Sequence, residues 1–94
     1  MHYFVYMITN KFNTTLYIGV TNNLQRRMLE HKMKIYPGFS KKYNLTKLIY
    51  YEVYESAEEM IRREKQLKKW KRRWKEDLIN ENNSRWNDLT KDPI

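Results

Sequence analysis

Cysteine is absent from the 94-residue sequence, which excludes disulfide scaffolds, zinc sites built on thiolates and cysteine nucleophiles. Glycine and proline occur only twice each, so collagen-like and low-complexity chains are excluded as well. No apolar run approaches the roughly 18 residues that mark a membrane-crossing helix. The first residues lack the basic segment and small-residue cleavage site of a secretory signal. We therefore expect a cytoplasmic protein without a membrane partner.

Several catalytic signatures are also missing. The sequence has no Walker loop, no dinucleotide-binding fingerprint and no serine–histidine–aspartate arrangement, so we expect no small-molecule cofactor. It also lacks the cluster of acidic residues that a two-metal nuclease needs. Any chemistry must therefore use the oxygen and nitrogen atoms of scattered polar side chains.

Positive charge is what the sequence has in excess. Its formal net charge is +8 at pH 7, and nine of the fourteen residues from Arg62 to Lys75 are Lys or Arg. Glu64 is the only acidic residue of that segment. A concentrated positive field points to a polyanion, and we expect nucleic acid, although ribosome association or an acidic protein would satisfy the charge equally.

Two strands are predicted near the start of the chain. Residues 3–9 and 16–20 favour aromatic and β-branched types and flank a turn-forming segment, which indicates a hairpin. With the turn centred between Lys11 and Phe12, Tyr6 lies opposite Tyr17. The two phenols would then stand side by side, with Cβ atoms about 5 Å apart.

A helix is predicted from residue 23 to about residue 34, with Asn22 and Gln25 as its capping box. Helical spacing places four side chains on one face: Leu24, Arg27, Met28 and His31. We expect a loop at residues 36–39 and a third strand at residues 48–54.

Ser56 and Glu59 form a second capping box, which opens a helix with a break near residues 71–73. The predicted apolar side of this helix carries Met60, Ile61, Leu67, Trp70, Trp74 and Leu78. One domain is expected over residues 1–80. It is followed by a polar tail, residues 81–94, which we expect to dock through Trp86 and Leu89.

Glu64 falls within the apolar side of this helix, between the directions of Met60 and Ile61. An inward carboxylate is costly unless it is paired or binds a metal. One interpretation is an ion pair with Arg62, Arg63 or Lys68. The other is a ligand for a hard cation such as Mg²⁺, and the helical pattern alone fits both.

Arg27 and His31 are spaced to project together from the first helix, beside the end of the second strand, where Gly19 lies. Lacking a Cβ atom, Gly19 either marks a bulge or lets another group come close. Arg27 alone fits a solvated helix residue, and His31 alone fits a residue packed at the core margin. Tyrosine is common in strands, so the two strand tyrosines carry little information by themselves.

Taken in their order along the chain, these residues resemble the GIY-YIG nuclease domain, above all its small stand-alone bacterial members. The matching segments are Phe4-Val5-Tyr6, Tyr17 to Thr21, Leu24 to Arg27, Glu30-His31, Lys41 to Tyr43, Arg63 to Gln66 and Lys68 to Arg72. The resemblance spans about residues 3–80. It implies an α+β fold, a three-stranded antiparallel sheet flanked by helices, which is the element order that the residue patterns predict independently. Phe4 departs from the family motif, which has glycine there, and Val20 stands where some relatives carry lysine.

The resemblance also implies hydrolysis of phosphodiester bonds with one divalent metal ion, Mg²⁺ or Mn²⁺. Tyr17 matches the general base or proton relay, Tyr6 the residue that positions the attacking water, and Arg27 the ligand of the scissile phosphate. His31 matches a position that assists the nucleophile or the leaving group, and Glu64 matches the metal ligand. A phenol is a weak base at pH 7, so this chemistry needs positive charge nearby.

We therefore expect a metal-dependent endonuclease that acts on DNA rather than RNA and selects particular DNA structures. The alternatives are a non-catalytic nucleic-acid-binding module that uses the same basic helix, and a small protein-interaction adaptor. The residues expected to bind the nucleic-acid backbone are Lys65, Lys68, Lys69, Lys71, Arg72, Arg73 and Lys75. An inward carboxylate favours the enzyme, because a pure binder of phosphate gains nothing from it.

Overall fold

The computed structural model describes residues 1–91 of the chain. The elements follow in the order β1 (Tyr3–Thr9), β2 (Leu16–Thr21), α1 (Leu24–Lys32), α2 (Phe39–Lys42), β3 (Lys47–Tyr54), α3 (Ala57–Lys69), α4 (Arg72–Asn82) and a 3₁₀ turn, η1 (Leu89–Lys91). The last three residues of the predicted tail, 92–94, lie outside the described residues.

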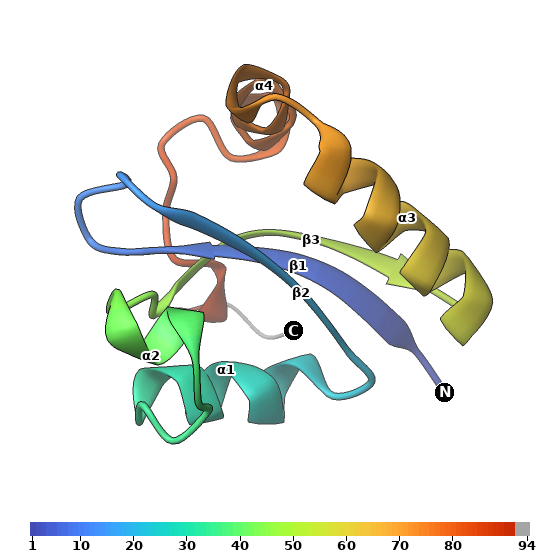
Figure 1. Cartoon of the computed structure of the whole chain (residues 1–94), viewed down its shortest axis with the longest axis horizontal. Coiled ribbons are helices and arrows are strands. Elements are labelled where there is room, and N and C mark those ends of the chain that lie inside the picture. Colours follow the sequence, from blue (N-terminus) through green and yellow to red (C-terminus); the bar gives the residue numbers. More distant parts are fainter. Residues whose placement is uncertain (92–94) are drawn as a thin grey trace.

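The three strands form one antiparallel sheet in the order β2-β1-β3, which confirms the predicted fold class. The central strand β1 is buried from Val5 to Thr9, because helices cover both faces of the sheet. Figure 1 shows α3 and α4 on one face and α1 and α2 on the other. Strand β2 is an edge strand, so groups from the two faces can approach each other around it.

Each face of the sheet has its own hydrophobic core. The core under α3 and α4 contains Val5, Met7, Ile18, Ile49, Tyr50, Met60, Leu67 and Ile79. The core on the side of α1 contains Tyr6, Ile8, Leu24, Met28, Leu45 and Leu48. Alternate residues of β1 thus enter opposite cores, as the two-residue period of a strand requires.

The predicted hairpin is present, but the predicted register is wrong by two residues. Tyr6 pairs with Gly19, and Tyr17 pairs with Ile8. The turn is longer than expected because the Asn10 side chain closes it, with Nδ2 donating to the Thr14 hydroxyl at 2.7 Å. A shift of two residues keeps every side chain on its face, so both tyrosines still point to the side of α1.

Two local predictions for the next segment are also corrected. The N-cap of α1 is Asn23 rather than Asn22, and its side chain accepts a hydrogen bond from the Arg26 N–H at 3.0 Å. The segment expected to be a loop gives way to the short helix α2 at Phe39. A single turn of helix is too short to produce a recognisable hydrophobic period.

The second helical region begins as predicted, since the Ser56 hydroxyl accepts a hydrogen bond from the Glu59 N–H at 3.1 Å. The break lies at Trp70 and Lys71, whose backbone is extended, slightly earlier than expected. Two residues assigned to the apolar side are instead exposed: Ile61 is 42% exposed and Trp74 is 51% exposed. The chain changes direction between α3 and α4 (Figure 1), so a single helical wheel does not describe both helices.

The segment after α4 passes from one face of the sheet to the other. Trp86 packs against the core under α3 and α4, and Leu89 packs against the core on the side of α1. Between them, the Asp88 carboxylate pairs with Lys32 of α1 at 2.6 Å. Among residues 1–91, no helix is long and apolar enough to cross a membrane.

Candidate active site

Tyr6 and Gly19 meet directly because the register of β1 and β2 makes them partners. An added Cβ at Gly19 would lie 2.4 Å from both Cζ and the hydroxyl oxygen of Tyr6. The Tyr6 ring therefore lies across β2, in space that only glycine leaves open. Of the two roles considered for Gly19, the close approach of another group is the one observed, and the approaching group is the Tyr6 phenol.

A chain of hydrogen bonds runs from Arg27 through the Tyr6 hydroxyl to His31 and Ser40. The three distances are 3.4 Å from Arg27 Nη1 to Tyr6, 2.9 Å from Tyr6 to His31 Nε2, and 2.8 Å from His31 Nδ1 to Ser40. Arginine can only donate, so the Tyr6 hydroxyl accepts from Arg27 and donates to His31. The same logic assigns the proton of neutral His31 to Nδ1, which donates to the Ser40 hydroxyl.

Both central members of this chain are buried and neutral at pH 7. Burial, together with the nearby Arg27 charge, lowers the pKa of His31 to about 4. Burial also raises the pKa of Tyr6 well above its usual value. Because Tyr6 is 0% exposed, its hydroxyl is enclosed by these hydrogen-bond partners, where it orients Arg27 and His31. Its expected role in positioning the water stays a prediction.

The Arg27 guanidinium is held on several sides. Nη1 also donates to the Val20 carbonyl at 3.2 Å, and Nε donates to Glu30 at 3.3 Å. The guanidinium carbon lies 4.3 Å from the centre of the Tyr36 ring. Among residues 1–91, Nη2 has no hydrogen-bond partner, and the side chain is 22% exposed. One edge of a fixed guanidinium therefore faces outward, as the fork that binds a phosphate requires.

Tyr17 is the half-buried phenol of the group. Its ring stacks on Phe39 at 6.1 Å between centroids and meets His31 edge-on at 6.2 Å. The pKa of Tyr17 is raised, first by burial and then by the neighbouring Tyr36 phenol. The Glu64 carboxylate acts in the same direction, and Arg27 opposes it. Tyr17 thus lies within the electrostatic reach of both Arg27 and Glu64.

Glu64 approaches Tyr17 from the opposite face of the sheet, around the edge strand β2, on which α3 packs. Its side chain is 18% exposed, which agrees with the predicted inward direction. The carboxylate pairs with Lys68 at 3.1 Å, so of the two interpretations considered, the ion pair is formed in this structure. The negative charge of the same carboxylate also raises the pKa of the Tyr17 phenol.

The set of donors around Glu64 bears on which metal could bind. Residues 1–91 contain no group of three His, Cys, Asp or Glu side chains that could hold a metal ion. A single carboxylate does not suit zinc, which takes three or four protein ligands. It does suit Mg²⁺, which keeps several waters and takes its remaining ligands from substrate phosphates. The residues present therefore fit Mg²⁺ or Mn²⁺ at Glu64.

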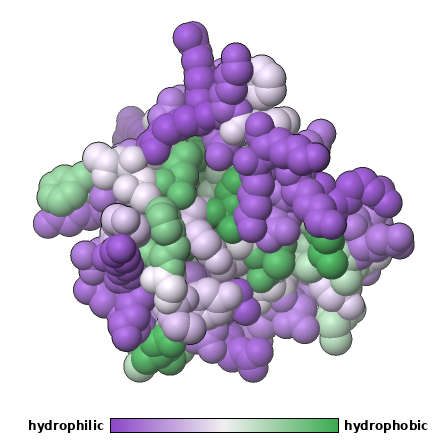
Figure 2. Space-filling view, viewed as in Figure 1, coloured by the Kyte–Doolittle hydropathy of each residue, from purple (hydrophilic) through white to green (hydrophobic). Residues whose placement is uncertain are grey.

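The predicted nucleic-acid-binding residues do not all behave alike. Lys65, Lys69 and Arg73 are exposed. Lys68 is occupied by Glu64, as described. Arg72 donates to the carbonyls of residues 13 and 14 at 3.1 and 2.8 Å and pairs with Glu76, so it anchors the β1–β2 turn to α4. Lys71 is exposed, and Lys75 is partly buried. Figure 2 shows hydrophilic side chains crowding over α3 and α4, above a paler band across the sheet.

Sequence reasoning missed three residues of the cluster: Glu30 as a partner of Arg27, Tyr36 as its stacking surface, and Ser40 as the acceptor for His31. Tyr36 comes from the predicted loop at residues 36–39, and Ser40 comes from the unpredicted helix α2 just after it. A signal was present in part, because a buried histidine needs a partner for its second ring nitrogen. The sequence contains no pattern that would select Ser40 over other hydroxyl groups.

Comparisons with known proteins identify the family and support the fold. A family model described as the GIY-YIG catalytic domain matches residues 2–77. A UPF0213 protein of Syntrophus aciditrophicus is 36% identical over 72 residues, covering 76% of this chain and 83% of the relative. One from Staphylococcus haemolyticus is 34% identical over 83 residues, covering 84% and 95%. The solution structure of the UPF0213 protein BH0048 from Bacillus halodurans has a TM-score of 0.60 at 26% identity, covering 97% of this chain and 96% of that one.

Proposed function

Since the chain belongs to the GIY-YIG catalytic domain family, we propose that it is a metal-dependent endonuclease that hydrolyses phosphodiester bonds in DNA. The observation that carries the proposal is that Arg27, Tyr17 and Glu64 gather around β2: Arg27 donates to the Val20 carbonyl of this strand, Tyr17 is part of it, and α3, which carries Glu64, packs on it. They come from three different elements, and the hydrogen-bonded chain through Tyr6 and His31 holds the first of them in place.

Arg27 is the residue that we assign to the scissile phosphate. Its Nη1 and Nε are held by Tyr6, Val20 and Glu30, while Nη2 is left for a ligand. A guanidinium fixed before the substrate arrives loses little entropy on binding and offsets the negative charge that grows on phosphorus. The buried Tyr6 and His31 are positioning residues for this group.

We assign Tyr17 to the attacking water. Tyr6 and His31 are buried, whereas Tyr17 keeps an accessible surface. With its pKa raised, it carries its proton at neutral pH. It therefore acts as a relay and not as a phenolate formed beforehand. As the water oxygen bonds to phosphorus, Tyr17 takes the water's proton and passes its own proton to a phosphate oxygen of the substrate. The Arg27 charge favours this transfer, since it opposes the rise in the pKa of Tyr17.

Glu64 would hold the divalent cation, with Lys68 displaced from its ion pair. Bound there, the cation supplies Lewis-acid stabilisation of negative charge on the phosphate oxygens. Lys68 is 52% exposed, so breaking its pair with Glu64 costs little. The released Lys68 ammonium is then available to pair with a phosphate of the same substrate.

A plasmid cleavage assay tests this function. Supercoiled DNA is incubated with the pure protein and Mg²⁺, or with a chelator in its place, using wild type, Glu64→Gln and the control Glu58→Gln. Glu58 is an exposed carboxylate on the same helix. We expect nicking by wild type and Glu58→Gln with Mg²⁺ only, and none by Glu64→Gln. Equal nicking by Glu64→Gln and wild type would reject the metal role.

A second candidate, a nucleic-acid-binding module without catalysis, is favoured by the Glu64–Lys68 ion pair, which neutralises the carboxylate without a metal. This candidate predicts DNA affinity with no cleavage under any divalent metal. Measuring DNA binding beside the cleavage assay separates it from the nuclease.

A further inference from the structure

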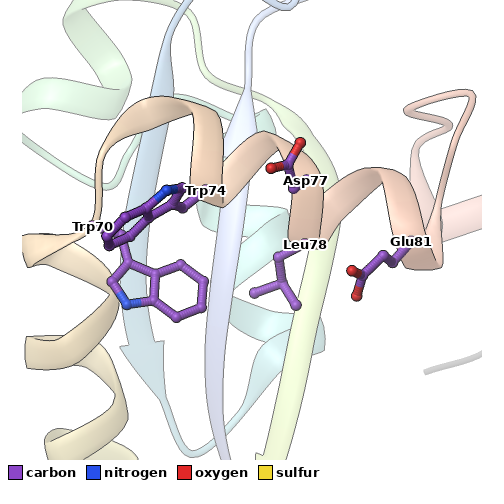
Figure 3. Close-up of a pocket in the computed structure, with 5 residues that line it drawn as sticks. All are labelled: Trp70, Trp74, Asp77, Leu78 and Glu81. Atoms are coloured by element: carbon purple, nitrogen blue, oxygen red, sulfur yellow. The ribbon is translucent and has the colours of Figure 1, made fainter.

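Two tryptophans stand at the junction of α3 and α4, outside the site described above. Trp70 ends α3 and Trp74 lies in the first turn of α4, with ring centroids 6.2 Å apart and planes at 84°. Trp74 is 51% exposed, a large apolar surface that the core does not use. Figure 3 shows the two indoles next to each other at the start of α4. An exposed aromatic of this size is typical of a binding surface.

Two hollows of opposite charge share these tryptophans. The larger hollow, about 490 Å³, is also lined by Arg62, Lys65, Gln66 and Lys69 of α3. The smaller one, about 250 Å³, is also lined by Asp77, Leu78 and Glu81 of α4, which Figure 3 shows along the helix beyond Trp74. The larger hollow therefore suits an anionic ligand with an aromatic part, and the smaller one repels it.

We propose that an unpaired base of single-stranded DNA stacks on Trp74 in the larger hollow, with its flanking phosphates on Arg62, Lys65 and Lys69. Nucleic acid combines a flat aromatic group with regularly spaced negative charge, which is the combination that this hollow complements. The proposal deepens the proposed function and rests on it for the substrate class: DNA that carries a single-stranded segment.

In this proposal the base stacks on Trp74, which is the platform, and Trp70 forms one side of the hollow. The Arg63 guanidinium lies 5.1 Å from the Trp70 ring, so one face of that indole is already covered. Trp70 is also partly buried against the core, whereas Trp74 is exposed. The Lys71 ammonium lies 5.7 Å from the Trp74 ring and adds a further cation beside a stacked base. Bases inside a duplex are covered by their neighbours, so the platform discriminates against fully paired DNA.

The hollow and the candidate active site are close enough to contact the same DNA strand. Six residues of one helix separate Glu64 from Trp70, which is about 9 Å along the axis at 1.5 Å per residue. Lys65 and Lys68 lie on α3 within this interval, and Lys68 contacts Glu64. A single strand seated on Trp74 can thus continue along α3 toward Glu64, and the nearby duplex would be presented for cleavage.

The test is a binding measurement in a chelator, so that it does not depend on cleavage. Fluorescence anisotropy is recorded for a labelled oligothymidine and for a blunt duplex of equal charge. The proteins are wild type, Trp74→Ala, Trp74→Phe and the control Phe12→Ala. Phe12 is 72% exposed, lies in the β1–β2 turn and does not line the hollow. Circular dichroism verifies that each variant is folded.

We expect Trp74→Ala to weaken oligothymidine binding roughly 5- to 150-fold, the range of one base–aromatic stack, and to leave duplex binding unchanged. Trp74→Phe should retain part of the affinity, and Phe12→Ala all of it. Equal loss on both DNAs, or no loss on oligothymidine, would overturn the proposal. The proposal would also be overturned if polyglutamate of equal charge bound the wild type as tightly as oligothymidine does and Trp74→Ala weakened the binding of both equally. A protein that binds as expected yet never cleaves would instead count against the nuclease.

Discussion

Replacing Gly19 with alanine tests the contact on which the candidate site is built. The new Cβ would lie 2.4 Å from Cζ and 2.8 Å from Cε1 of Tyr6, far inside normal contact distance. Gly19 lies in an ordinary strand conformation, so alanine strains nothing but this contact. The Tyr6 ring must therefore move, and it has no free volume to enter because it is fully buried.

Two costs follow from that movement. Overpacking a core typically costs about 1–3 kcal/mol, and leaving buried hydrogen-bonding groups without their partners costs about 1–3 kcal/mol more. Their sum predicts a loss of roughly 2–6 kcal/mol in the free energy of unfolding. For a domain of this size, each kcal/mol lowers the melting temperature by about 4–8 °C, so the melting temperature should fall by at least about 8 °C.

Urea and thermal unfolding, followed by circular dichroism, measure this loss for Gly19→Ala, Tyr6→Leu and the double variant. Leucine lacks the ring atoms that the new Cβ meets, so the alanine should cost less than about 1 kcal/mol in the Tyr6→Leu background. A cost of the same size in both backgrounds, or no cost at all, would refute the claim that Gly19 is needed for the Tyr6 ring.

Three further predictions concern the cluster and its charged surroundings. Between pH 6.5, the usual pKa of histidine, and about pH 4, the pKa of His31 in the folded protein, the unfolded state binds a proton on His31 and the folded state does not. The free energy of unfolding should therefore fall by about 2 kcal/mol from pH 7 to pH 5. This dependence on pH should vanish in His31→Gln. Tyr36→Ala should lower the cleavage rate roughly 2- to 30-fold by releasing the stacked Arg27 guanidinium, while Tyr36→Phe should not, as single-turnover kinetics would show. Lys69→Gln combined with Arg73→Gln should reduce the log–log salt slope of duplex binding by about 0.9 per lost phosphate contact; an unchanged slope in titrations at several salt concentrations would remove these two residues from the DNA surface.

The sequence was sufficient for the order of the strands and the longer helices, though not for α2, and for the faces of the strands and the first helix. The two-residue period of β1 and the helical spacing of Leu24, Met28 and His31 are local patterns, and all three of those helix residues are buried. The register failed because it depends on turn length, and Asn10 lengthens the turn through side-chain hydrogen bonds that no periodicity encodes.

The candidate site was likewise predictable from the sequence only where local patterns determine it. Helical spacing placed Arg27 and His31 together, and the inward direction of Glu64 was visible on the helical wheel. The order of the hydrogen-bonded chain was not predictable, because Ser40 reaches it from α2, a helix too short to show a hydrophobic period. Tyr36, which stacks on Arg27, comes from the loop before that helix. The burial of Tyr6 follows from its place in the central strand between two helical layers.

The central claim is that Glu64 binds a divalent cation beside the phenol of Tyr17, around the edge of β2. The most direct measurement is paramagnetic broadening of the amide NMR signals by substoichiometric Mn²⁺. Broadening centred on Glu64, Tyr17 and Lys68, and abolished by Glu64→Gln, is the predicted result. Broadening centred on Asp77 and Glu81, or unchanged in Glu64→Gln, would contradict it.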